Sequence, residues 1–115
     1  MCKPFKYLTK NSNGFLVYCS KSETYQLSYK NLNFNLTREE LEGLVMYLKN
    51  IDCDYWEKEY ENSIYKKKIP IPTLQSNLMI LLDRYEVHDL LNLLEVNIEK
   101  EFLSLEDLKF ILCLN

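Results

Sequence analysis

The sequence predicts an α+β fold, with an antiparallel sheet of five or six strands, two amphipathic helices on one face and a short C-terminal helix. Three observations support this prediction. Short stretches of alternating polar and apolar residues fill the first third of the chain. The segments 31–48 and 77–94 then repeat a strand, a capped turn and a helix, 46 residues apart. Only two glycines and three prolines occur in 115 residues, which leaves little room for long loops.

The first third of the chain predicts a meander of four strands, whose ranges are 5–9, 15–19, 25–29 and 32–36. Asn13-Gly14 is the strongest short signal for a hairpin turn. Tyr25, Leu27 and Tyr29 alternate with polar residues, which is the period of a half-buried strand. Because the connections are short, neighbouring strands should pair antiparallel.

A first helix is expected to follow Thr37. Thr37 and Glu40 fit a capping box, in which the hydroxyl accepts from the Glu40 amide and the carboxylate reaches back. Gly43 lies off the apolar stripe of this helix, where it costs helix stability and indicates a close approach. The stripe consists of Leu41, Leu44, Val45, Leu48 and Ile51.

An aromatic connector follows the first helix. Asp52 or Asp54 is expected to cap a short helix there. The connector leads into an edge strand over 69–72, because Pro70 and Pro72 omit backbone donors on the same side of a strand.

An apolar strand over 78–82 comes next and leads into a second helix. Asp83 and Glu86 form its capping arrangement. Val87, Leu90, Leu91, Leu94 and Ile98 repeat the apolar stripe of the first helix. A short C-terminal helix is expected to start near Ser104.

The two similar segments suggest an internal ββα repeat. Their matched positions are Asn31/Asn77, Leu32/Leu78, Leu36/Leu82, Arg38/Arg84, Glu40/Glu86, Leu44/Leu90 and Leu48/Leu94. The copies also differ. In the first segment, Asn33 and Asn35 indicate that the outer face of the strand is exposed to solvent. In the second, Met79 and Leu81 indicate that the equivalent face is covered. The cover could be the 55–65 segment, the C-terminal helix or a second subunit.

Composition predicts one domain over 1–115, with a strand meander and first helix in 1–52 and the remaining elements in 53–115. The net charge of −3 provides no basic field, so nucleic acid is an unlikely partner. No apolar run is long enough to span a membrane, and the N-terminus lacks an apolar signal region. Scattered cysteines at 2, 19, 53 and 113 indicate free thiols and a cytoplasmic protein. No cofactor or metal is expected.

Several pieces of the chain also resemble a known family. They are Asn13-Gly14, the stretch 25–36 (YQLSYKNLNFNL), Tyr55-Trp56 and the stretch 67–86 (KKIPIPTLQSNLMILLDRYE). The chain resembles a family of short uncharacterised proteins from Bacteroidetes, especially flavobacteria. The resemblance implies a source and assigns no site.

Two candidate surfaces remain. Five apolar and aromatic residues could form an interaction surface: Tyr55, Trp56, Tyr60, Met79 and Leu81. Four basic residues could form an anion patch: Lys66, Lys67, Lys68 and Arg84. Lysines beside an edge strand more often protect it from aggregation, so the second reading is the weaker one.

We therefore expect a small non-catalytic cytosolic binding protein that acts on a protein partner or as a homodimer. One alternative is a nucleic-acid or anion-binding protein that uses the 66–68 lysines. Another is an enzyme of unrecognised type using His88, the only histidine. No phosphate-binding glycine loop or nucleophile motif is present to favour it.

Overall fold

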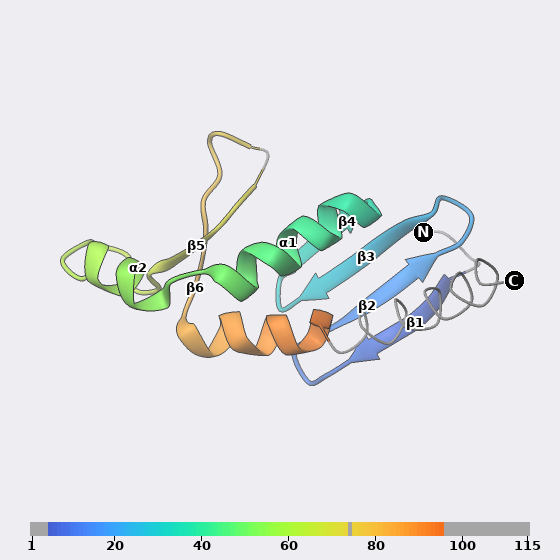
Figure 1. Ribbon diagram of the computed structural model, residues 1–115, viewed down its shortest axis with the longest axis horizontal. Coiled ribbons are helices and arrows are strands. Elements are labelled where there is room, and N and C mark those ends of the chain that lie inside the picture. The colour runs from blue at the N-terminus through green and yellow to red at the C-terminus, as the bar shows by residue number, and fades with distance from the viewer. Residues whose placement is uncertain (1–4, 74, 96–115) are drawn as a thin grey trace, which may run out of the picture.

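The computed structural model describes residues 5–73 and 75–95 (Figure 1). Four strands form an antiparallel sheet in the order β1-β2-β3-β4. Their bounds are Phe5–Lys10 for β1, Gly14–Cys19 for β2, Thr24–Tyr29 for β3 and Leu32–Leu36 for β4. The predicted meander is therefore present, with each strand paired to its neighbour in sequence.

Two further strands form a separate antiparallel ribbon: β5 spans Ile69–Ile71 and β6 spans Ile80–Leu82. The expected single sheet of five or six strands is thus divided into sheets of four and two strands. The cause is the path of the chain. After β4 the chain runs through two helices before it turns back into β5, so β5 pairs with β6 and neither strand pairs with β4 (Figure 1).

Helix α1 (Arg38–Asn50) begins with the predicted capping box. The Glu40 amide donates to Thr37 Oγ1 at 3.2 Å, and the Thr37 amide donates to Glu40 Oε1 at 2.8 Å. Helix α2 (Cys53–Glu59) is capped by Asp52, whose Oδ1 accepts from the Tyr55 amide at 3.0 Å. Each helix starts where a short polar side chain satisfies a free amide of its first turn.

A third helix occupies 84–95 at the end of the described residues. Its capping box is also reciprocal. The Glu86 amide donates to Asp83 Oδ1 at 2.8 Å, and the Asp83 amide donates to Glu86 Oε1 at 3.0 Å. Strand, cap and helix therefore do occur twice. The larger ββα repeat is not confirmed, because β4 belongs to the main sheet and β6 to the separate ribbon. The expected C-terminal helix near Ser104 lies outside the described residues.

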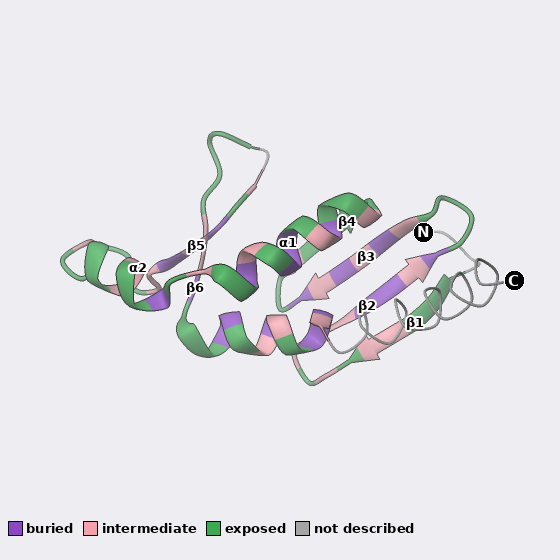
Figure 2. Cartoon of the chain, viewed as in Figure 1, coloured by how far each residue is buried: buried purple, intermediate pink, exposed green. Residues whose placement is uncertain are grey.

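The core lies between one face of the four-stranded sheet and the helices (Figure 2). The third helix contributes a buried stripe, and the ribbon closes one end of the core with Ile69, Ile71 and Leu82. The sheet and α1 supply Leu16, Tyr25, Leu27, Tyr29, Leu41, Leu44, Val45 and Leu48. The residues from α1 match the predicted apolar stripe, apart from Ile51, which is half-buried at the C-cap.

Candidate functional site

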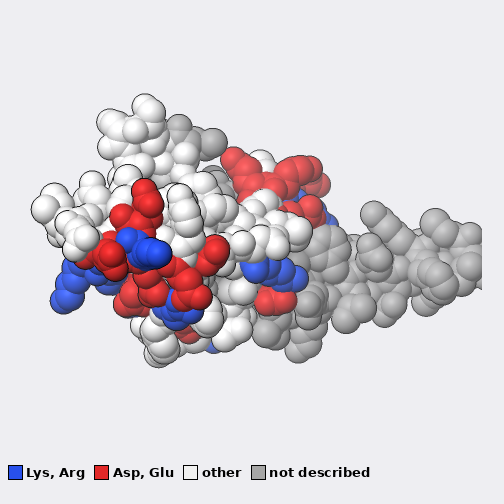
Figure 3. All heavy atoms as spheres, turned by 60° about the vertical axis from the view of Figure 1, so that its left-hand side comes forward, with Lys and Arg blue, Asp and Glu red and all other residues white. Residues whose placement is uncertain are grey.

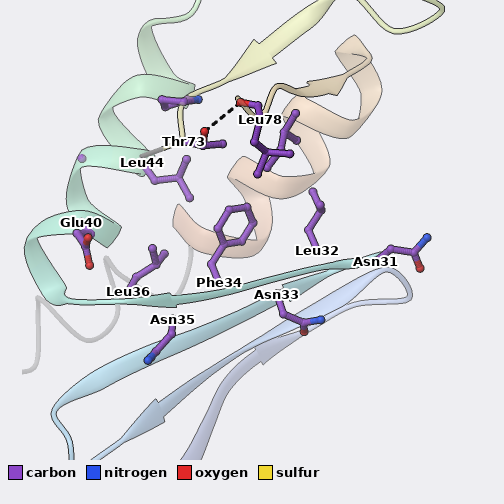
Figure 4. A pocket seen from close by; sticks show the side chains of 13 residues that line it. Asn31, Leu32, Asn33, Phe34, Asn35, Leu36, Glu40, Leu44, Thr73 and Leu78 are labelled. Atoms are coloured by element: carbon purple, nitrogen blue, oxygen red, sulfur yellow. Dashed lines mark hydrogen bonds between the residues drawn. The ribbon is translucent and has the colours of Figure 1, made fainter. Parts of the chain in front are cut away.

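An open groove of about 590 Å³ runs between β4, α1 and the loop that joins β5 to β6. Figure 4 shows Leu32, Phe34 and Leu36 pointing from β4 into this groove, toward Leu44 of α1 and Leu78 of the loop. The side chains of Asn33 and Asn35 point to the other side of β4. The groove therefore has an apolar floor and apolar walls. We call it the β4 groove.

The lining of the β4 groove includes every residue from Asn31 to Leu36. Side chains of a strand alternate between its two faces. The side chains of Asn33 and Asn35 point away from the groove, so these two residues line it with backbone atoms. The groove therefore runs along the whole length of β4, and backbone groups of this strand are within its reach. β4 is an edge of the sheet, since β3 is its one neighbour in the described sheet order.

Glu40, Gly43 and Leu44 form the helical wall of the groove. The sequence indicated that Gly43 marks a close approach between segments. That expectation is wrong for the described residues, because a Cβ atom at Gly43 would have no neighbour within 4 Å. Gly43 instead leaves part of the helical wall without a side chain. It thereby widens the groove at the centre of α1.

The loop after β5 forms the third wall with Pro72, Thr73, Leu78 and, at its end, Ile80. The Thr73 hydroxyl donates to the Leu78 carbonyl at 3.1 Å, which joins the two arms of the ribbon beyond the paired strands (Figure 4). The Tyr47 hydroxyl donates to the Pro70 carbonyl at 2.7 Å and ties the ribbon to α1. These hydrogen bonds fix the height of this wall above β4.

A polar cluster anchors the third helix to the β1–β2 turn and the end of β3. Asp89 Oδ2 accepts from the Tyr29 hydroxyl at 2.8 Å and from Asn13 Nδ2 at 2.8 Å. Asp89 Oδ1 accepts from Asn11 Nδ2 at 3.1 Å. Burial, followed by the hydrogen bond to Asp89, raises the pKa of Tyr29. Three donors converge on one carboxylate, so the helix has a single position on the sheet.

Glu86 is the buried charged residue of the described core, with 1% of its surface exposed. Its carboxylate contacts Lys30 Nζ at 2.6 Å and Lys67 Nζ at 2.8 Å. Burial by itself would raise the pKa of Glu86. Hydrogen bonds from the two lysines and the Asp83 amide outweigh burial and lower this pKa to about 2. Because this pKa lies far below neutral pH, Glu86 stays ionised. Its negative charge anchors the third helix to Lys30 and Lys67.

The predicted interaction surface is brought together only in part. Tyr55, Trp56 and Tyr60 form a continuous aromatic row on α2 and its end, with ring centroids 5.0 Å and 5.7 Å apart. Leu81 lies in β6, and Met79 lies in the loop just before this strand. Met79 is 51% exposed and Leu81 half-buried, so residues 5–73 and 75–95 leave Met79 uncovered. Of the covers expected from the sequence, the C-terminal helix lies outside the described residues, and a second subunit stays a prediction.

The predicted anion patch is divided among intramolecular partners. Arg84 pairs with Asp54 and, at 2.6 Å, with Glu57. Lys67 pairs with Glu86, and Lys68 Nζ donates to the Tyr65 carbonyl. Figure 3, which turns the α2 end of the molecule forward, shows acidic side chains among the basic ones. Two of the predicted cations thus have carboxylate partners, and the surface offers no uniform positive field for a phosphate backbone.

The remaining candidates, His88, Cys53 and Cys19, do not line the β4 groove. His88 is exposed on the third helix. Cys53 is a free buried thiol, and burial raises its pKa. Cys19 is disulfide-bonded, so the expectation of free thiols is wrong for this residue. The described residues contain no group of three or more potential ligands that could hold a metal ion. In the described part of the chain, no helix has the length and apolar character needed to cross a membrane.

Sequence reasoning missed the β4 groove, although one signal pointed to it. Leu32 and Leu78 are matched positions of the two similar segments, as are Phe34 and Ile80 by the same offset. All four residues line the groove. The two segments thus present equivalent strand positions to one cavity. The sequence analysis singled out Met79 and Leu81, which belong to the opposite alternation of the same strand.

Comparison with known proteins gives a family but no activity. No curated protein and no solved structure matches the chain. A family model described as "Family of unknown function (DUF6686)" matches residues 1–115. The predicted resemblance to a family without assigned function is thereby confirmed, while its restriction to Bacteroidetes stays a prediction. The chain belongs to this family of unknown function, DUF6686.

Proposed function

We propose that this protein is a small non-catalytic interaction domain that binds an apolar segment of a partner protein in the β4 groove. The observation that carries the proposal is the groove itself: about 590 Å³, open, and floored by Leu32, Phe34 and Leu36. Apolar surface that stays exposed on a small domain is typical of a binding site. Leu78, on the rim, is 51% exposed and is available to such a partner.

Gly43 supports the same proposal. An exposed glycine within a helix costs about 0.5–1 kcal/mol relative to alanine. No described neighbour is close enough to exclude a side chain at this position. Space for a ligand is a reason to keep a glycine at this position.

A peptide library displayed on phage and selected against the wild-type chain tests the proposal. Gly43→Phe fills the groove from its helical wall and serves as counter-selection. Met46→Phe places the same ring on an exposed position of α1 that does not line the groove, and is the matched control. We expect selected peptides to lose at least tenfold in affinity with Gly43→Phe and to bind Met46→Phe like wild type. Equal affinity for all three proteins would remove the groove as the binding site. Circular dichroism establishes that each variant is folded.

Self-association at a different surface is a second proposal. Met79 is 51% exposed, and Tyr55 on α2 is 53% exposed. A second subunit over Met79 would provide the cover that the sequence predicts. Light scattering after size-exclusion chromatography should then give a dimer that Met79→Glu dissociates. A monomer at every concentration would refute this proposal.

A cytoplasmic location, predicted from the sequence, completes the proposal. It fits only if Cys19 is reduced in the cell, because disulfides are rare in cytosolic proteins. Mass spectrometry of protein alkylated in intact native cells decides the point. Full alkylation of Cys19 before any reductant is added supports the cytoplasm. If Cys19 is alkylated only after a reductant is added, the protein resides in an oxidising compartment.

A further inference from the structure

We infer that the partner segment binds the β4 groove as an extended strand and lengthens the sheet by pairing with β4. This inference rests on the proposed function and specifies the conformation and chemistry of the partner. Three properties of the groove lead to it: an accessible strand edge, the absence of edge protection on β4, and the distribution of apolar and acidic side chains along it.

The edge of β4 is available for pairing. β4 pairs with β3 along its whole length, from Leu32 opposite Tyr29 to Leu36 opposite Tyr25. On its other side, no strand within residues 5–73 and 75–95 pairs with it. The backbone N–H and C=O groups directed to that side are those an added strand would bond. The groove follows this edge from Asn31 to Leu36.

β4 lacks the devices that normally keep a strand edge from pairing. Natural edges carry lysines, prolines or bulges. The opposite edge strand, β1, has Lys6, Lys10 and a shift in register between Tyr7 and Thr9. In the ribbon, Pro70 lies within β5. β4 reads LNFNL, without charge, proline or bulge. Of the two edge strands of the main sheet, β4 is therefore the one that can pair with an added strand.

The side chains of the groove define which strand would fit. An added strand presents every second side chain to the face of the sheet that Leu32, Phe34 and Leu36 occupy. These side chains would enter the space bounded by Leu44, Leu78 and Ile80, which favours aliphatic residues. β4 has five residues, so the paired segment should be about that long. The bare surface at Gly43 gives room for the bulkiest of its side chains.

Charge defines one end of the segment. Glu40 lines the groove beside Leu36, and Glu39 precedes it in the first turn of α1 (Figure 4). Arg38, also in this turn, pairs with Glu42 at 3.2 Å. The chain as a whole has a net charge of −3. A basic side chain at the end of the partner segment near Leu36 would therefore be favoured. The partner is an extended segment with alternating aliphatic residues and a lysine or arginine at one end.

Two measurements on peptides from the library selection test the inference. First, the selected sequences should have aliphatic residues at every second position and an enriched basic residue at one end. Second, each amide of one selected peptide is N-methylated in turn. An added strand bonds β4 through alternate amides only, so methylation at one parity should weaken binding at least tenfold and at the other parity leave it nearly unchanged. Glu40→Gln should weaken binding of the peptide. Glu59→Gln, on the exposed end of α2, should leave peptide binding unchanged.

The outcomes separate the inference from the proposed function. Peptides that bind wild type and lose affinity with Gly43→Phe, yet show no alternation under N-methylation, overturn strand pairing and leave the groove as the site. Peptides indifferent to Gly43→Phe overturn the proposed function itself. A chain that is dimeric in light scattering, and that Gly43→Phe makes monomeric, identifies a second copy as the occupant and overturns the inferred partner.

Discussion

Leu32 and Leu78 line the same groove, although they lie 46 residues apart in the sequence. Leu32 comes from the edge of the four-stranded sheet, and Leu78 from the loop just before β6. They hold equivalent positions in the two similar segments of the sequence. The groove is thus formed where the two segments face each other, with α1 between them in sequence as the third wall.

The two glycines should respond in opposite ways to alanine. At Gly43 a Cβ atom meets open space, so Gly43→Ala should stabilise the protein by about 0.5–1 kcal/mol through helix propensity. At Gly14 a Cβ atom would lie 2.0 Å from the Ser28 carbonyl oxygen, which forces β2 and β3 apart. We expect Gly14→Ala to cost about 3 kcal/mol. Urea unfolding of both variants and wild type measures the difference. A destabilised Gly43→Ala would mean that the helix is packed on that side.

Glu86 should make stability depend on acid pH. Its pKa is about 2 in the folded protein and about 4.3 in an unfolded chain. A lowered pKa contributes stability that is present above the unfolded value and is lost as pH falls from about 4 to 2. We expect wild type to lose on the order of 2–3 kcal/mol over this range that Glu86→Gln does not lose. Urea unfolding between pH 7 and pH 2.5 tests this, with Glu59→Gln as exposed control. Parallel pH curves for wild type and Glu86→Gln would contradict it.

The hydrogen bond between Tyr29 and Asp89 should contribute measurably to folding. Tyr29 is fully buried, and its hydroxyl donates to the side-chain carboxyl group of Asp89. We expect Tyr29→Phe to cost about 1–2 kcal/mol. Tyr55→Phe, at an exposed ring, should change stability by less than about 0.5 kcal/mol. A double-mutant cycle of Tyr29→Phe with Asp89→Ala should give a coupling of at least about 0.5 kcal/mol. Strictly additive losses would show that the two groups act independently.

The thiols should differ sharply in reactivity. Burial raises the pKa of Cys53 and shields it, so the folded protein should react slowly with iodoacetamide at pH 7.5. In urea without reductant Cys53 should react quickly, while Cys19 should require reductant because it is disulfide-bonded. Peptide mass spectrometry distinguishes the two sites. Rapid labelling of Cys53 in buffer would show that α2 opens readily.

Local sequence rules predicted the parts of this fold that depend on near neighbours. The alternation in β3 placed Tyr25, Leu27 and Tyr29 in the core, and all three are buried. Both capping boxes formed as expected, because cap and partner are three residues apart. The exposed sides of Asn33 and Asn35 also agree with their polar character.

The rest depends on contacts between distant segments. The partners of Arg84 are 27 and 30 residues away, and Lys67 meets Glu86 across 19 residues. The short sequence distance between the lysines therefore suggested one basic patch. In the folded protein, Lys67 and Arg84 instead pair with different carboxylates. The strand around β6 is apolar at consecutive positions, so its periodicity could not decide whether Leu78 and Ile80 or Met79 and Leu81 face the groove.

The hydrogen bonds that Asn11 and Asn13 donate to Asp89 span 78 and 76 residues. Closing such a large loop costs conformational entropy, and only the contacts of the fully folded protein offset this cost. The meander can form early from short-range pairings, but the third helix must dock before Tyr29, Asn11 and Asn13 find their acceptor. We therefore expect folding and unfolding in one cooperative step. A chain cut between α2 and β5 should yield two pieces that reassemble when mixed and that lack the native tertiary structure when apart.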